Sequence, residues 1–138
     1  MKDNQSKSMN SSLRWLKQAE ADFDAAHDST ESEHFEWACF QAQQAAEKAL
    51  KAFLHAQGLR AIITHSTAEL LIEAQKYESF DIPLKHAKIL DSYYIPTRYP
   101  NGLPGEDIPA HYYSKEDADT CINYAESILR SVKKYIKN

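Results

Sequence analysis

The segment 35–57 constrains the fold more than any other stretch, because it predicts a helix that is apolar around most of its circumference. It reads FEWACFQAQQAAEKALKAFLHAQ, in which alanines, Cys39, Leu50 and Phe53 recur at steps of three and four residues. It contains neither proline nor glycine, and Gly58 follows as a natural C-cap. A helix with so much apolar surface needs neighbours on more than one side, so we expect it at the centre of a bundle. Three polar positions mark the one side that we expect to face solvent or a partner: Gln41, Gln44 and Lys48.

The rest of the chain predicts four more helices and an all-α fold. Apolar residues at helical spacing place them over about 13–29, 66–78, 82–93 and 115–136. Ser11 or Ser12 caps the first, Ser66 and Glu69 form a capping box at the third, and Ser114 caps the last. We predict five helices, four of them in an antiparallel up-and-down bundle, with a long Pro-rich loop before the last helix. Residues 1–11 are polar and are predicted to form a disordered tail, with a single domain over 12–138.

Composition excludes several classes of function. The net charge of −4 argues against binding nucleic acid over a broad basic surface, although a local basic pocket remains compatible with it. No apolar run approaches membrane-spanning length and the first twelve residues have no apolar core, so we expect a soluble, cytoplasmic protein. Cys39 and Cys121 fall on apolar helix faces and are predicted to be buried free thiols. The histidines show no metal-ligand spacing, so we predict neither a metal nor a cofactor.

Residues 95–113, IPTRYPNGLPGEDIPAHYY, differ in kind from the rest, since they hold four of the five prolines and two of the three glycines. This composition predicts a long, stiffened loop, and loops of this length in a compact domain are usually functional. Arg98 is the only basic residue between Lys88 and His111. The loop and its flanks also hold five of the eight tyrosines: Tyr93, Tyr94, Tyr99, Tyr112 and Tyr113.

An arginine among tyrosines suits the binding of a nucleotide. The guanidinium of Arg98 can bind a phosphate or carboxylate through two hydrogen bonds, and the tyrosines can stack on a base or pack against a partner. In the alternative interpretation the tyrosines cover the end of the bundle, and Arg98 forms an ion pair with Glu106 or Asp107.

The segment LDSYYIPTRYPNGLPGEDIPAHYYSKEDADTCINYAESIL resembles the HEPN domain family (higher eukaryotes and prokaryotes nucleotide-binding). WACFQAQQAAEKALKAFL, THSTAELL and RWLKQAEADFDAA share this resemblance, which covers about residues 12–136. It implies an all-helical bundle that forms homodimers, with the arginine-bearing loop near a cleft between protomers. It also implies a small nucleotidyltransferase as partner, commonly in a toxin–antitoxin pair, and many family members are metal-independent ribonucleases.

This sequence departs from the ribonuclease branch of that family, which carries an arginine and a histidine a few residues apart at the start of a late helix. Arg98 has no histidine until His111, thirteen positions on. Arg60 and His65 have the right separation, but they precede the third helix. We therefore interpret His65 as the capping or packing histidine of the family's helix start.

His111 and Tyr113 have the spacing of a motif in some toxin members, whose tyrosine is modified with AMP by the partner enzyme. A loop that folds back would place Arg98 beside His111. In the alternative, His111 is an exposed loop residue and Tyr113 packs under the last helix.

Three functional hypotheses follow. The first is a dimeric module that binds a nucleotide or RNA phosphate and works with a nucleotidyltransferase partner; its binding residues are Tyr93, Tyr94, Arg98, Tyr99 and Tyr113. The second is a metal-independent ribonuclease in which His111 is the general base and Arg98 stabilises charge on the phosphate. The third is a protein–protein adaptor whose loop contacts only its partner.

Overall fold

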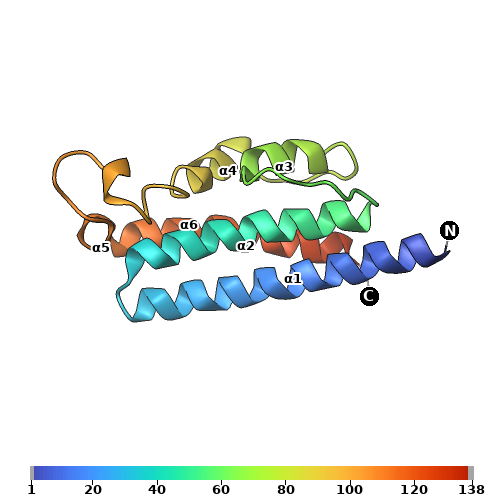
Figure 1. The fold of residues 1–138 in the computed structure, drawn as a ribbon, viewed down its shortest axis with the longest axis horizontal. Coiled ribbons are helices and arrows are strands. Elements are labelled where there is room, and N and C mark those ends of the chain that lie inside the picture. Colours follow the sequence, from blue (N-terminus) through green and yellow to red (C-terminus); the bar gives the residue numbers. More distant parts are fainter. Residues whose placement is uncertain (1, 137–138) are drawn as a thin grey trace.

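The computed structural model describes residues 2–136, with side chains from Met9 on, and all regular structure in that range is helical (Figure 1). The elements are α1 (Lys2–Glu31), α2 (Phe35–Ala56), α3 (Thr67–Ala74), α4 (Leu84–Asp91), the 3-10 turn η1 (Pro100–Gly102), α5 (Pro109–Tyr112) and α6 (Lys115–Tyr135). The all-α prediction is confirmed. The described residues form six helices instead of the predicted five, because the Pro-rich loop itself contains the single turn α5.

Helix α1 begins at Lys2, well before the predicted start near residue 13. Residues 2–11 contain no proline or glycine, so nothing in them breaks a helix that the packed residues further on hold in place. Ser12 lies inside this helix, where its hydroxyl donates to the carbonyl of Ala52 at 2.8 Å. The helix thus runs on through Ser11 and Ser12, and the predicted serine cap is not formed.

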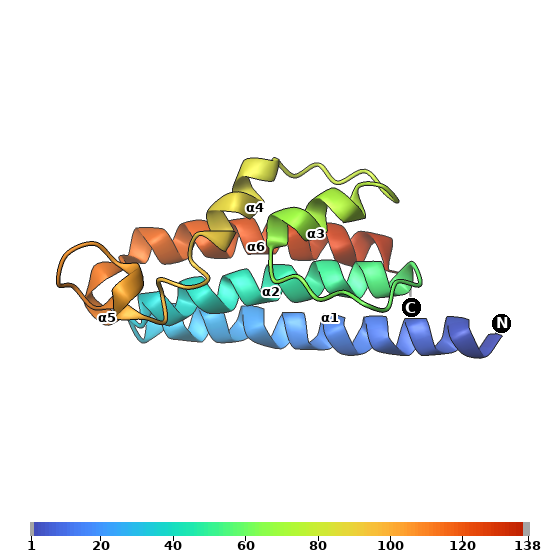
Figure 2. The same cartoon turned by 45° about the horizontal axis from the view of Figure 1, so that its top comes forward.

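Helix α2 lies at the centre, between α1 on one side and α6 on the other (Figures 1 and 2). Its apolar face is buried, and Leu50 and Phe53 are fully inaccessible to solvent. Cys39 and Cys121 are free and buried against each other, and their hydrogen bond and burial raise the pKa of the Cys39 thiol far above its ordinary value. The predicted central helix and buried free thiols are confirmed.

The order of the helices departs from an up-and-down bundle. Helices α1 and α2 are antiparallel, since Ser12 meets Ala52 at one end while Ser29 meets Gln41 at the other. Helices α2 and α6 instead run parallel, because their first turns meet at Cys39 and Cys121, while Phe53 meets Tyr135 near their ends, with ring centroids 6.0 Å apart.

Because α2 and α6 run parallel, the chain must return after the end of α2. It does so first along residues 57–66, which contain no helix. The short helices α3 and α4 then form a hairpin over α2 and α6 (Figure 2). The sequence predicts these two helices over about 66–78 and 82–93, but they are shorter, and eight residues each span only part of the bundle. The hairpin of α3 and α4 therefore stands where a fourth long helix would lie, and it covers only one part of α2.

The polar side predicted for α2 does not face solvent. Lys48 forms an ion pair with Asp22 of α1 at 2.6 Å, and Gln41 is hydrogen-bonded to Ser29 at 2.7 Å. Both side chains are half-buried, because α1 lies along that side of α2. These polar residues fix α1 against α2.

Candidate functional site

A second row of polar side chains on α2 is buried, and the apolar pattern of the helix hides it in the sequence. Its members lie at helical spacing on one face of α2: Glu36, Gln43, Glu47 and Lys51. Glu47 is 2% and Lys51 4% exposed, and charged residues are rarely so buried unless they are paired. This row is the floor of the candidate site.

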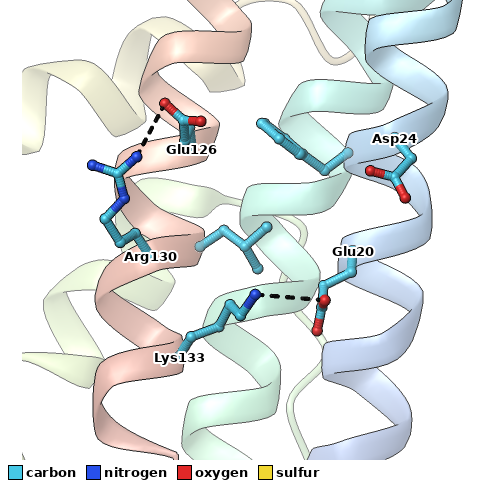
Figure 3. A pocket seen from close by; sticks show the side chains of 7 residues that line it. Glu20, Asp24, Glu126, Arg130 and Lys133 are labelled. Atoms are coloured by element: carbon cyan, nitrogen blue, oxygen red, sulfur yellow. Dashed lines mark ion pairs between the residues drawn. The ribbon is translucent and has the colours of Figure 1, made fainter.

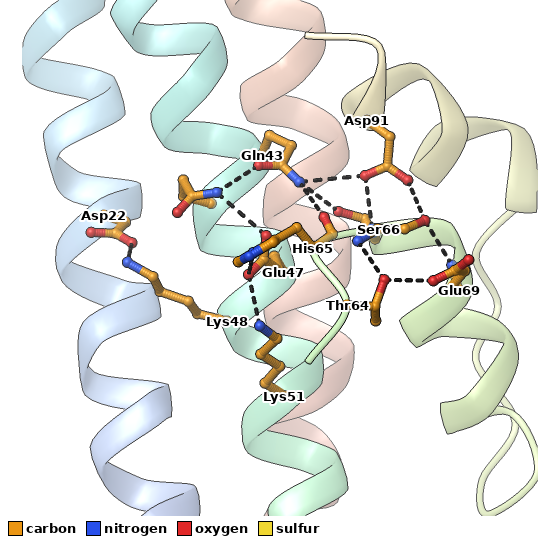
Figure 4. Close-up of polar contacts among 12 residues, drawn as sticks. Asp22, Gln43, Glu47, Lys48, Lys51, Thr64, His65, Ser66, Glu69 and Asp91 are labelled. Carbon is orange, nitrogen blue, oxygen red and sulfur yellow. Dashed lines mark hydrogen bonds and ion pairs between the residues drawn. The ribbon is translucent and has the colours of Figure 1, made fainter. Parts of the chain in front are cut away.

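Asp91, the last residue of α4, joins three helices at this floor. Its carboxylate accepts from the backbone N–H of Thr67 (2.7 Å) and of Ala68 (3.0 Å), both in the first turn of α3. It also accepts from the Ser66 hydroxyl (2.9 Å) and the Gln43 amide (3.4 Å). A carboxylate at a helix N-terminus satisfies free N–H groups and complements the helix dipole. Asp91 therefore fixes the start of α3 and the point from which the Pro-rich loop departs (Figure 4).

The capping box predicted at the start of α3 is half formed. The Ser66 hydroxyl accepts from the N–H of Glu69 at 3.1 Å, as predicted. The carboxylate of Glu69 binds the hydroxyl of Thr64 instead of returning to Ser66. Asp91, more than twenty residues away in the sequence, supplies the acceptors that complete the cap.

Glu47 lies at the centre of a polar cluster that reaches the surface (Figure 4). Its carboxylate forms an ion pair with Lys51 at 3.0 Å and a contact with the Nδ1 of His65 at 3.2 Å. Lys51 in turn lies over the ring of Trp15, with Nζ 5.4 Å from the ring centroid. The His65 side chain is 60% exposed, so this cluster connects a buried ion pair with an accessible imidazole.

Arg98 is held by aromatic rings. The central carbon of its guanidinium lies 4.5 Å from the ring centroid of Tyr94, 4.7 Å from that of Phe40 and 5.2 Å from that of Tyr99. Its Nε donates to the backbone carbonyl of Tyr94 at 2.9 Å. Such cation–π contacts fix the plane of a guanidinium without occupying its N–H groups.

The terminal nitrogens of Arg98 have no hydrogen bond or ion pair with any residue in the range 9–136, over which side chains are described. The ion pair with Glu106 or Asp107 considered above is therefore not formed. The outer edge of the guanidinium is available to an acceptor from outside the chain.

The ring of Tyr94 connects Arg98 with His65. The imidazole stacks on this ring with a centroid distance of 5.6 Å and an interplanar angle of 17°. Tyr94 thus contacts the guanidinium and the imidazole, which come from loops more than thirty residues apart. The candidate site consists of Arg98, Tyr94, Tyr99 and His65 over the floor formed by α2.

The other predicted site residues lie in a second cluster at the start of α6. The hydroxyl of Tyr93 donates to Asp117 at 2.9 Å, and its ring lies 5.6 Å from that of Tyr113. Burial raises the pKa of the Tyr93 phenol above its ordinary value, and burial raises the pKa of Tyr113 to about 12. Asp117 also completes the capping box with Ser114, so the predicted cap of the last helix is confirmed.

His111 lies exposed in the single turn of α5. Within the part of the chain that the structure describes, no hydrogen bond, ion pair or ring contact joins it to Arg98. Of the predicted residues, the structure therefore groups Arg98 with Tyr94 and Tyr99. It groups Tyr93 with Tyr113 and leaves His111 apart from Arg98.

A groove of about 300 Å³ lies elsewhere, between α1 and α6 (Figure 3). Its apolar floor carries charged side chains at the rim, where Lys133 faces Glu20 at 3.6 Å and Arg130 faces Glu126 at 3.5 Å. Each cation there has an acidic neighbour, unlike Arg98. The groove lacks a free charge that could select a phosphate.

The described residues contain neither a cluster that could hold a metal nor a helix that could span a membrane. No cluster of three or more histidine, cysteine, aspartate or glutamate side chains is placed to hold a metal ion. None of the helices in this range is long and apolar enough to cross a membrane.

Comparison with known proteins places this geometry in context. A family model described as the HEPN domain matches residues 12–135. The crystal structure of TT1696 from Thermus thermophilus is 40% identical in sequence, with a TM-score of 0.81 over 91% of this chain and 98% of that one. ST0689, described as an archaeal HEPN homologue, is also 40% identical, with a TM-score of 0.73 over the same shares of the two chains.

Two further relatives are more distant. A HEPN domain protein from Thermotoga maritima, tm0613, is 30% identical, with a TM-score of 0.65 over 88% of this chain and 95% of that one. Among curated proteins, one named as a candidate toxin, MJ1304 of Methanocaldococcus jannaschii, is 28% identical over 131 residues. The match covers 89% of this chain and 86% of MJ1304.

Proposed function

Because the chain belongs to the HEPN domain family, we propose that it is a toxin-like HEPN protein that binds a nucleotide or RNA phosphate at Arg98. In this proposal it acts as a homodimer together with a small nucleotidyltransferase.

The observation that carries the proposal is the state of Arg98. Three rings and one backbone carbonyl fix its guanidinium, while its terminal N–H groups have no acceptor within residues 2–136. A planar cation held in this way loses little conformational entropy when it binds, and its two parallel donors match two oxygens of a phosphate. Since the net charge is −4, attraction of RNA depends on this local cation more than on the field of the whole protein.

The neighbouring rings suit the rest of a nucleotide. Tyr99 is 49% exposed beside the guanidinium, so its face is accessible to a base. Stacking of bases on aromatic side chains tolerates any sequence, which fits a site with a single charged anchor. A single-stranded RNA or a free nucleotide fits this arrangement better than a duplex, whose bases are already stacked.

The toxin class and the partners rest on relatives and on the surface of the loop. MJ1304 carries a toxin designation, and the family resemblance implies dimers and a nucleotidyltransferase partner. The Pro-rich loop and its flank expose apolar side chains that a partner could cover: Ile95, Tyr99, Ile108 and Tyr112.

Light scattering at micromolar concentration should give twice the protomer mass of 15.8 kDa, and a species of 15.8 kDa alone would refute the homodimer. A gene for a small nucleotidyltransferase beside this one would support the partner.

Binding titrations on Arg98 variants test the site. The probe is a fluorescein-labelled oligouridylate read by fluorescence anisotropy, with AMP as a competitor. Arg98→Ala should lose about 1.5–3 kcal/mol of affinity, the range for a hydrogen bond to a charged group. Arg98→Lys keeps the charge but not the planar fork, so it should recover only part of this loss.

Arg130→Ala is the matched control, because it removes the same charge from a surface arginine that already faces Glu126. It should bind RNA like the wild type. Thermal melts separate binding from folding, since Arg98→Ala also removes its ring contacts and should cost about 1–2 kcal/mol of stability. Lower stability with unchanged RNA affinity would mean that Arg98 only holds the loop, and the proposed site would be wrong.

A further inference from the structure

His65 has features that a capping or packing residue does not need. Its side chain makes no cap for α3, since Ser66 and Asp91 bind the free N–H groups of that helix. It is 60% exposed, yet a 2% exposed glutamate, Glu47, holds one of its ring nitrogens at 3.2 Å. A buried carboxylate aimed at an accessible imidazole is a costly arrangement to build for packing alone.

The contact with Glu47 fixes which nitrogen of His65 carries a proton. Lys51 donates to the same carboxylate at 3.0 Å. An ionised carboxylate can only accept, so Nδ1 carries the hydrogen and donates to it. The other nitrogen, Nε2, is then free for a ligand. The His65 ring also stacks on Tyr94, the same ring that the Arg98 guanidinium contacts.

We propose that His65 is a second phosphate contact at the Arg98 site, with Glu47 as the residue that positions it. Nε2 of the protonated imidazole donates to a phosphate oxygen of a single-stranded RNA whose neighbouring phosphate, or the same one, is bound by Arg98. This inference rests on the proposed function, because it assumes that Arg98 binds phosphate. The Arg98 site thereby gains His65, a residue that the sequence pattern alone assigns to the start of a helix.

The charged and titratable groups around His65 come from every element that packs near it: Glu47 and Lys51 on α2, Glu69 on α3, Asp91 on α4, and Tyr94 and Arg98 on the following loop. Lys51 balances Glu47, and Asp91 is bound by four donors. The Glu69 carboxylate accepts a hydrogen bond from the Thr64 hydroxyl. Arg98 is therefore the cation of this group whose terminal nitrogens have no acceptor among the residues whose side chains the structure describes.

Affinity for RNA should consequently follow the protonation of His65. Histidine changes charge between about pH 5 and about pH 8, while a phosphodiester stays anionic throughout. Since the phosphate binds the protonated ring better, affinity should rise as the pH falls from about 8 to about 6, on the order of tenfold. A residue that only packs would give no such profile.

The test measures binding of the labelled oligouridylate, without a terminal phosphate, between these two pH values. The wild type should show the tenfold change, whereas His65→Gln, which keeps a polar side chain without the charge, should bind at every pH as weakly as the wild type does near pH 8. His34→Gln is the matched control, since it removes an exposed imidazole whose side chain makes no hydrogen bond within residues 2–136, and it should keep the wild-type profile. Glu47→Gln should weaken RNA binding, because a neutral amide holds Nδ1 less firmly than a carboxylate does.

A second readout does not depend on whether the Glu47 variant folds. In nitrogen-15 spectra of the wild type, the imidazole of His65 should carry its neutral-state proton on Nδ1, and bound RNA should move its titration to higher pH. An unchanged pH profile in His65→Gln, or a titration that RNA does not move, would overturn the role of His65. If Arg98→Ala abolishes binding while His65→Gln keeps the wild-type profile, the proposed function stands and only this inference fails. A wild type that binds no RNA at either pH refutes both.

Discussion

Removal of the Asp91 carboxylate is the most direct perturbation of the framework that holds the candidate site. This side chain accepts from four donors on α2 and at the start of α3, at distances between 2.7 and 3.4 Å. It is also the last helical residue before the loop that carries Arg98. Asp91→Ala should therefore loosen the hairpin of α3 and α4 without touching the apolar core.

The magnitude follows from the donors left without a partner. Thr67 is fully buried and Ala68 nearly so, which means that their N–H groups cannot turn to water. Each buried donor without an acceptor costs about 1–3 kcal/mol, and a lost helix cap about 0.5–2 kcal/mol. Since these costs overlap, we expect Asp91→Ala to lower the free energy of unfolding by about 3–4 kcal/mol. Asp91→Asn keeps one acceptor oxygen and should lose about half as much.

Urea titration followed by circular dichroism measures this change, with Asp81→Ala as the matched control. Asp81 is exposed and makes no side-chain hydrogen bond or ion pair within the described residues, so its removal changes the net charge equally and should cost less than about 0.5 kcal/mol. A cost below about 1 kcal/mol for Asp91→Ala, at an unchanged dependence on urea, would show that the carboxylate does not hold the three helices together.

Three further perturbations probe the core, the charge balance and the loop. Leu50→Ala and Phe53→Ala should each lower the free energy of unfolding by about 2–5 kcal/mol in urea, because both side chains are fully buried. Burial, with help from Lys51, lowers the pKa of His55 below its ordinary value of 6.5. The unfolded chain therefore binds a proton at His55 more readily than the folded protein does, and stability should fall as the pH drops below that value. His55→Gln should flatten this dependence of the melting temperature on pH. Gly102→Ala should lower the melting temperature, since its Cβ would lie 3.0 Å from the backbone of Pro96.

The central helix could be predicted from the sequence because its signal is local. Alanines and large apolar residues at three- and four-residue steps identify a buried helix whatever surrounds it. The capping box at Ser114 is local in the same way, since Ser114 and Asp117 lie three positions apart, and so is the half of the box that Ser66 forms with the N–H of Glu69. The same signal cannot say how far α1 extends or that α2 and α6 run parallel, because these depend on which faces meet in space.

The candidate site was predicted only in part, for a related reason. Tyr94, Arg98 and Tyr99 are close in the sequence, and their side chains also lie together in the structure, while their role in binding stays a prediction. Tyr113 is a few residues from His111 but belongs to the cluster at the start of α6. His65 could not be placed against Tyr94 from spacing, because segment 57–66 must first fold back along α2. One local signal was available: polar residues recur at helical spacing on α2 at Gln43, Glu47 and Lys51, beside the polar row of Gln41, Gln44 and Lys48.

The buried pair of Glu47 and Lys51 allows a test of whether this polar row exists for stability or for the site. Removal of one member leaves an unpaired buried charge, so Glu47→Ala or Lys51→Ala should cost about 3–5 kcal/mol in urea titrations. Replacement of both by apolar residues of similar volume, Glu47→Leu with Lys51→Met, removes the cost of taking two charges out of water as well as their attraction.

We expect the double variant to be within about 1 kcal/mol of the wild type in stability, and so more stable than either single variant. Its Arg98 site should still bind RNA, but the pH dependence attributed to His65 should be lost because no carboxylate holds Nδ1. If the double variant instead loses as much stability as either single variant, the ion pair stabilises the fold in its own right. The burial of Glu47 beneath an exposed histidine would then need no functional explanation.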